Sequence, residues 1–162
     1  MKAEHPIEIK STFLALHAIP LEYKDRVDEF VQLMVNQVLP KVASEGLADF
    51  VDAFCEEGYF SVAHMNQLID AAQTLGLQAK VHVNQFNIIG GVEAAVQRNA
   101  RSVDHLEELN EKDVEVLLSG NTMPVALPAC SFFLRIPYTP MRKLIESGLP
   151  VALATEIGRA NV

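Results

Sequence analysis

Short apolar runs alternate along this chain with longer stretches in which apolar residues recur every three or four positions. Six of the runs are brief and bounded by caps or breaker residues, as β-strands are. Their apolarity is continuous rather than alternating, which is typical of strands that a parallel sheet buries on both faces. The six predicted strands are Ser11–Ala18, Asp49–Cys55, Gln78–Val83, Arg101–His105, Thr122–Leu127 and Pro150–Thr155.

Helical patterns fill the intervals between the predicted strands. The apolar residues of Val27–Leu39 follow the i, i+3, i+4, i+7 spacing of one helical face. Ser61 is a suitable N-cap for a second helix that would run to Leu75 and stop at Gly76. Caps and breakers predict three further helices. The first covers Val92–Arg98 and follows Gly90-Gly91. The second starts at the cap Asn110 and ends at Gly120, and the third starts at Thr139-Pro140 and ends at Gly148.

The predicted order is therefore six strands separated by helices, in one α/β unit without a linker or low-complexity tract. Right-handed crossovers would give a parallel sheet with helices outside it. An open doubly wound sheet and most of a barrel both fit this order. The open sheet predicts a glycine-rich phosphate loop, and the sequence has neither GxGxxG nor a Walker motif. The pair Gly90-Gly91 is weak evidence for an anion site, so the residues alone leave both folds open.

Composition narrows the class of protein. The chain has 162 residues, 49% of them hydrophobic and 21% charged, which is ordinary for one globular domain. The net charge is −8 and no Lys/Arg cluster occurs, so we expect neither nucleic acid nor a membrane as a partner. Cys55 and Cys130 form no CxxC and are too few for a disulfide framework, which favours a cytoplasmic location.

Two histidines stand where predicted strands end. His82 closes one strand and His105 closes the next. Because the carboxyl ends of strands in a strand–helix repeat converge on one mouth, both imidazoles are expected to face the same site. The pair therefore suggests a metal-assisted reaction. The alternative for each is a structural hydrogen bond, which Asp104 would provide for His105.

Several segments, in order, resemble the imidazolonepropionases of the amidohydrolase superfamily. They are residues 11–20 (STFLALHAIP), 46–56 (GLADFVDAFCE), 80–91 (KVHVNQFNIIGG), 102–107 (SVDHLE) and 150–155 (PVALAT). The resemblance implies a (β/α)8 TIM barrel of the metal-dependent amidohydrolase type, incomplete here with about six β/α units. Residues 1–162 would then be a single partial barrel domain covering barrel strands three to eight, the C-terminal part of a longer enzyme.

The resemblance also implies what such a chain would lack. The family's first two barrel strands, its small β-domain and its His-x-His metal pair have no counterpart in this sequence. The five histidines are His5, His17, His64, His82 and His105, and no two of them form a His-x-His. An open barrel exposes its first and last strands as edges, which favours association, so a homodimer is expected.

The reaction implied by the resemblance is a hydrolysis in histidine degradation. Water opens the imidazolone ring of 4-imidazolone-5-propanoate and gives N-formimidoyl-L-glutamate. One Zn²⁺ or Fe ion per site would activate the water by lowering its pKa. The small-molecule substrate and this ion are the implied partners of the site.

The resemblance assigns a role to each candidate residue. His82 is expected to bind the metal, and His105 to orient the nucleophile and stabilise the developing oxyanion. His17, in its His-Ala-x-Pro loop, is expected to contact the substrate. Gln85 is expected to hydrogen-bond the substrate, although an amide cannot take a proton. Glu156 stands where the family has an aspartate that binds metal and accepts a proton, and its extra methylene would displace the carboxylate.

Two other functions remain open at this stage. The chain could be a non-catalytic barrel remnant or interaction module, which the lack of a His-x-His favours. It could also be a sister amidohydrolase such as a ring deaminase, against which the His17-Ala18-Ile19-Pro20 loop argues. For the chain alone we expect weak metal binding and little turnover. Glu56 and Glu57, which follow a predicted strand, are interpreted as a solvated loop pair.

Overall fold

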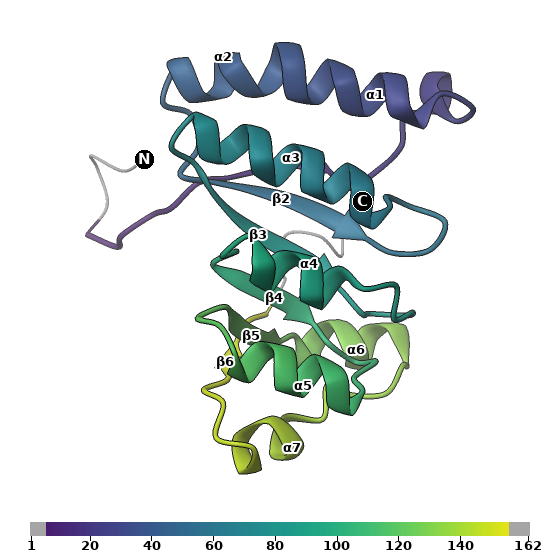
Figure 1. Cartoon of the computed structure of the whole chain (residues 1–162), viewed down its shortest axis with the longest axis vertical. Helices are drawn as coiled ribbons and strands as arrows, with labels where there is room; N and C mark the ends of the chain where they lie inside the picture. The colour runs from purple at the N-terminus through teal and green to yellow at the C-terminus, as the bar shows by residue number, and fades with distance from the viewer. Residues whose placement is uncertain (1–5, 156–162) are drawn as a thin grey trace.

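The computed structural model describes residues 6–155. One sheet forms the centre of this part of the chain, and all of its strand pairs are parallel (Figure 1). The predicted strands are confirmed; β3 has the predicted bounds, and the others are one or two residues shorter at one or both ends. They are β1 Thr12–Leu16, β2 Phe50–Cys55, β3 Gln78–Val83, β4 Ser102–His105, β5 Met123–Ala126 and β6 Ala152–Leu153.

The order of the strands decides between the two folds that the sequence left open. Each strand pairs with the next one along the chain, in the order β1-β2-β3-β4-β5-β6. A doubly wound sheet reverses its order at a switch point, and this sheet does not. Because right-handed crossovers in such a sequential sheet place every helix on the same face, the sheet is one wall of a barrel. In the described residues β1 and β6 are its edges; association through them stays a prediction.

Helices follow each strand but the last, as predicted. They are η1 Leu21–Tyr23, α1 Val27–Leu33, η2 Met34–Val38, α2 Leu39–Ser44, α3 Val62–Thr74, α4 Gly91–Gln97, α5 Glu111–Leu118, α6 Pro128–Leu134 and α7 Met141–Glu146. Ser61 and Asn110 cap α3 and α5 by accepting the backbone N–H three residues later, which confirms both predicted caps. Among the described helices none is both long and apolar enough to cross a bilayer.

Three details of the helices differ from the prediction. The first predicted helix continues beyond Leu39 to Ser44, through the π-helical turn η2, and Pro40 lies in the first turn of α2 that follows. Helix α6 was missed because its aromatic residues do not point into the core: Phe132 is 75% exposed. Thr139 does not cap α7, which begins after Pro140 without a side-chain cap. The hydroxyl of Thr139 instead donates to the backbone oxygen of His105.

The two faces of the sheet have opposite characters. Every second side chain of the central strands packs under the helices and is completely buried, namely Val51, Ala53, Cys55, Val81, Val83 and Val103. The intervening side chains share the other face, because Asp52 pairs in register with Lys80, and Phe54 with His82. The inner face of the barrel wall therefore carries the polar and aromatic groups.

Gly91 allows α4 to pack directly on β3. A Cβ at this position would lie 2.7 Å from Cγ1 of Val83 and 3.5 Å from Sγ of Cys55. Replacing Gly91 by alanine should therefore lower the free energy of unfolding by about 1–3 kcal/mol, the usual cost of overpacking a rigid core. Urea denaturation measures this change. In a Val83→Ala background, which removes the contacted methyl, the same substitution should cost less, and an equal cost in both backgrounds would contradict the explanation.

Candidate active site

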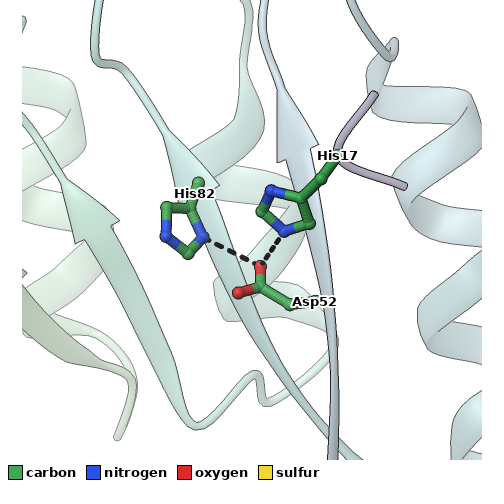
Figure 2. Close-up of side chains that lie close together, drawn as sticks. All are labelled: His17, Asp52 and His82. Atoms are coloured by element: carbon green, nitrogen blue, oxygen red, sulfur yellow. Dashed lines mark hydrogen bonds and ion pairs between the residues drawn. The ribbon is translucent and has the colours of Figure 1, made fainter. Parts of the chain in front are cut away.

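A cluster of two imidazoles and one carboxylate lies on the inner face of the sheet (Figure 2). Oδ1 of Asp52, on β2, lies 2.9 Å from Nδ1 of His82 at the end of β3. The same oxygen lies 3.2 Å from Nε2 of His17, the residue that follows β1. The ring centroids of the two histidines are 5.0 Å apart. One carboxylate oxygen thus joins side chains from three neighbouring strands.

Asp52 is an ionised carboxylate in a buried place. Only 3% of the residue is exposed. Burial alone would raise its pKa, but the nearby His82 and the hydrogen bonds from both imidazoles outweigh burial and hold the pKa below its usual value. The carboxylate therefore acts as a hydrogen-bond acceptor at neutral pH, and its charge strengthens both contacts.

The cluster has the chemistry and the size of a metal site. One potential ligand atom from each of His17, Asp52 and His82 lies within 4.8 Å of the other two. Imidazole nitrogens and carboxylate oxygens are the donors that Zn²⁺ and Fe commonly take in proteins. The residues present therefore fit the ion that sequence analysis expects.

His105 joins this group through an unusual backbone conformation. His105 pairs in register with Val83, a core residue, so regular alternation would point the histidine toward the helices. Its φ is +87°, and that of Leu106 is +63°, values that residues other than glycine rarely adopt. The ring of His105 instead lies with its centroid 5.1 Å from that of His82. Strained backbone of this kind concentrates at functional sites, where other contacts hold it in place.

Those contacts come from the loop after β4, from helix α6 and from the segment between α6 and α7. Nδ1 of His105 lies 3.4 Å from Oε2 of Glu107, and Oε1 of the same carboxylate accepts a 2.7 Å hydrogen bond from Ser131. Thr139 binds the backbone oxygen of His105, as described above. Asp104, the expected partner in the structural interpretation, accepts a hydrogen bond from Ser102. Glu107 is thus the carboxylate beside His105.

Gln85 lies in the loop after β3, and hydrogen bonds to a buried glutamate fix the conformation of this loop. The carboxylate of Glu56 accepts hydrogen bonds from the backbone N–H groups of Gln85, Phe86 and Asn87. Glu56 is only 1% exposed, so its interpretation as a solvated residue was wrong, whereas Glu57 is exposed. Burial raises the pKa of Glu56, and the three N–H donors offset part of that rise.

The structure brings three of the predicted site residues together. His17, His82 and His105 follow one another at ring-centroid distances of 5.0 and 5.1 Å. The side chain of Gln85 turns to α6, where its amide donates to Sγ of Cys130 at 3.6 Å. Glu156 lies outside the described residues. The convergence predicted from the strand ends of His82 and His105 is therefore observed, and His17, which the resemblance placed in the site, lies beside His82.

Comparisons with known proteins support one family. The chain is 54% identical over 156 residues to the imidazolonepropionase of Christiangramia forsetii and 53% identical over 156 residues to that of Flavobacterium psychrophilum. Over 157 residues it is 41% identical to the imidazolonepropionase of Alkaliphilus oremlandii. Over almost its whole length the chain is thus similar to imidazolonepropionases. No model of a protein family matches it.

The chain spans only part of these imidazolonepropionases. The first two alignments cover 96% of this chain and 38% of the relative's length. Solved structures agree on the fold: the triazine hydrolase of Arthrobacter aurescens has a TM-score of 0.62 at 10% identity, covering 89% of this chain and 36% of its own. The 5-methylcytosine deaminase of Klebsiella pneumoniae has a TM-score of 0.59 at 17% identity, covering 78% and 36%. Together with the sequential parallel sheet, these structures support the partial TIM-barrel fold.

Two carboxylates of this site were missed from the sequence. Asp52 is a single charged residue inside the apolar run of β2, and such a buried charge needs a partner. That signal was available, but no histidine could be paired with it without the strand register. Glu107 follows His105 by two residues, and its contact depends on the positive φ at His105, which sequence does not reveal.

Proposed function

We propose that this chain provides the catalytic wall of an imidazolonepropionase, which hydrolyses 4-imidazolone-5-propanoate to N-formimidoyl-L-glutamate. The observation that carries the proposal is the gathering of His17, His82 and His105 on the inner face of a barrel wall. It occurs in a chain that is 54% identical to an imidazolonepropionase. Water adds its oxygen to the ring carbonyl carbon, the ring C–N bond breaks, and the departing nitrogen takes a proton.

A bound Zn²⁺ or Fe ion would polarise the carbonyl and lower the pKa of the attacking water. We assign its ligation to His82 and to Glu156, which stands outside the described residues. The donor chemistry at His82, which belongs to the cluster of potential ligand atoms, supports its share of this assignment. A related fold, the atrazine chlorohydrolase of Arthrobacter aurescens, has been solved in complex with zinc.

The remaining site residues act on the substrate. His105 is assigned to hydrogen-bond the oxyanion that develops on the ring carbonyl, and Glu107 beside it supports the ring in the required orientation. His17 is assigned to contact the substrate. Gln85 is assigned a hydrogen bond to it, for which the amide must leave Cys130.

The six strands are assigned to barrel positions three to eight. This assignment is supported by the sequential parallel order of the sheet and by the chain's 38% share of its relatives' length. The family's His-x-His pair, its first two strands and its small β-domain would then come from outside this sequence. A metal held mainly by His82 has incomplete coordination, because catalytic zinc sites generally use three protein ligands.

Substrate binding by the chain tests the proposal. We expect 4-imidazolone-5-propanoate to shift the ring resonances of His17 and His105 in ¹⁵N-labelled protein, and His17→Ala to weaken binding. His64, bonded to Ser61 and Asp28 on the helical side, serves as the matched control, and His64→Ala should leave binding unchanged. Absence of any shift at millimolar substrate would favour a non-catalytic module. A preference for cytosine would favour a ring deaminase.

Turnover of the same substrate tests the assignment to barrel positions three to eight. With zinc or iron added, the chain should form N-formimidoyl-L-glutamate at less than about 1 s⁻¹, the lower end of the usual range for enzymes. Mass spectrometry of the product measures this rate. Turnover within the usual range would show that no further ligands are needed.

A further inference from the structure

We propose that Asp52 is a positioning residue that sets the tautomers of His82 and His17. In this arrangement Nε2 of His82 carries the lone pair that binds the metal ion. The inference deepens the proposed function, since it rests on the metal role assigned to His82. It concerns a residue that touches the two histidines rather than the substrate.

The argument begins with the shared oxygen. Oδ1 of Asp52 lies within hydrogen-bond distance of Nδ1 of His82 and of Nε2 of His17. One carboxylate oxygen can accept a hydrogen bond from each of two nitrogens, so both short contacts are satisfied when the two ring nitrogens are the donors. A neutral His82 then carries its proton on Nδ1, and a neutral His17 carries its proton on Nε2. The second nitrogen of each ring points away from Asp52 (Figure 2).

The backbone holds Asp52 in a fixed place. It lies in the middle of β2, which pairs with β1 on one side and β3 on the other. Its chain neighbours Val51 and Ala53 are fully buried on the opposite face. Because the strand is fixed on both edges and packed below, the carboxylate can impose an orientation on the rings instead of following them. Carboxylates placed behind metal-binding histidines have this effect in many metalloproteins.

The cost of burying the carboxylate supports the same conclusion. A buried ion pair is often no more stabilising than apolar residues of similar volume, so packing alone does not explain an aspartate at this position. Phe54, two residues along on the same face, is a buried apolar side chain, so this face of the strand is not reserved for polar residues. The contacts that distinguish Asp52 are those with His17 and His82.

A competing arrangement makes Asp52 itself a metal ligand. The ion would then lie between Asp52, His17 and His82 and would replace the protons that now join them. Nδ1 of His82 would bind the metal in that case, whereas Nε2 binds it in the positioning arrangement. The ring nitrogen that responds to the metal therefore distinguishes the two.

The experiment reads the tautomers directly. Long-range ¹H–¹⁵N correlation spectra of the metal-free, ¹⁵N-labelled chain should show His82 protonated on Nδ1 and His17 protonated on Nε2. In Asp52→Asn these populations should shift toward the other tautomer, and zinc affinity should fall about 10–100-fold. Asp52→Glu keeps a carboxylate acceptor and should retain more of both properties than Asp52→Asn.

Asp104→Asn is the matched control. Asp104 is the register partner of His82 on β4, and its removal changes the charge near the ring by the same amount. Its hydrogen bond comes from Ser102, so the tautomers of His82 and His17 should not change in this variant. A shift as large as that in Asp52→Asn would show that charge alone matters and would overturn the proposal.

Zinc titration distinguishes Asp52 as a positioning residue from Asp52 as a metal ligand. The Nε2 resonance of His82 should move on addition of zinc. Movement of Nδ1 instead would make Asp52 a ligand and overturn the proposal, as would unchanged tautomers in Asp52→Asn. If Asp52→Asn does not fold, the unsubstituted chain decides, because a His82 protonated on Nε2 is incompatible with the inference. Since tautomers are read without metal, failure of zinc to perturb His82 would count against the proposed function alone.

Discussion

Replacing His82 by alanine should lower the zinc affinity of the chain by more than about 100-fold. This exceeds the 10–100-fold loss that follows removal of a partner behind a ligand, because the ligand itself is removed. The rings of His17 and His105 have their centroids 5.0 and 5.1 Å from that of His82, so neither can take its place without moving. Competition with a chromophoric chelator measures the affinity.

His64→Ala is the control for this experiment. Like the histidines of the site, His64 contacts a carboxylate, that of Asp28, but it belongs to α3 on the outside of the sheet. Its loss should cost some helix stability through the capping box with Ser61 and leave zinc affinity unchanged. Equal zinc affinities for His82→Ala and the unsubstituted chain would show that the metal does not bind at this mouth.

Replacing Glu56 by alanine should lower the free energy of unfolding by about 3 kcal/mol or more. The carboxylate is the acceptor for the backbone N–H groups of Gln85, Phe86 and Asn87. Each buried donor left without an acceptor costs about 1–3 kcal/mol, and the loss of the loop conformation limits how far the three costs add. Urea denaturation followed by circular dichroism measures the change.

Glu56→Gln separates the acceptor from the charge. The amide oxygen can still accept N–H donors, so this variant should lose less stability than Glu56→Ala. The exposed neighbour Glu57 provides a second comparison, and Glu57→Ala should change stability by less than about 0.5 kcal/mol. A loss in Glu56→Ala no larger than that in Glu57→Ala would mean that the loop after β3 does not depend on this carboxylate.

The sequence predicted the repeating units of this fold well because their signals are local. Short runs that are almost continuously apolar, such as Phe50–Cys55, identify strands, and caps such as Ser61 and Asn110 identify helix starts. The choice between an open sheet and a barrel wall was different. It depends on which strands pair, and the sequence of one strand does not identify the strand with which it pairs. Only the observed order of β1 to β6 resolves it.

The site was predictable to the extent that strand ends converge. His17, His82 and His105 follow or end strands, and parallel pairing brings such positions together. The carboxylates behind them were not predictable in the same way. Asp52 meets His82 because of a particular register, and Glu107 meets His105 because a positive φ turns the histidine out of the normal alternation. The strand register and the positive φ are properties of the assembled sheet, and neither can be read from the sequence.

The sequential pairing of the strands has a consequence for how this chain acquires its structure. Each strand finds its partner only one helical excursion away along the chain, so the loops that must close during folding are short. A nascent polypeptide can add each strand to the preceding one as it leaves the ribosome, with no need to wait for a distant segment. The contacts of His17 with Asp52 and His82 can therefore form once β3 is synthesised, before the last strands exist.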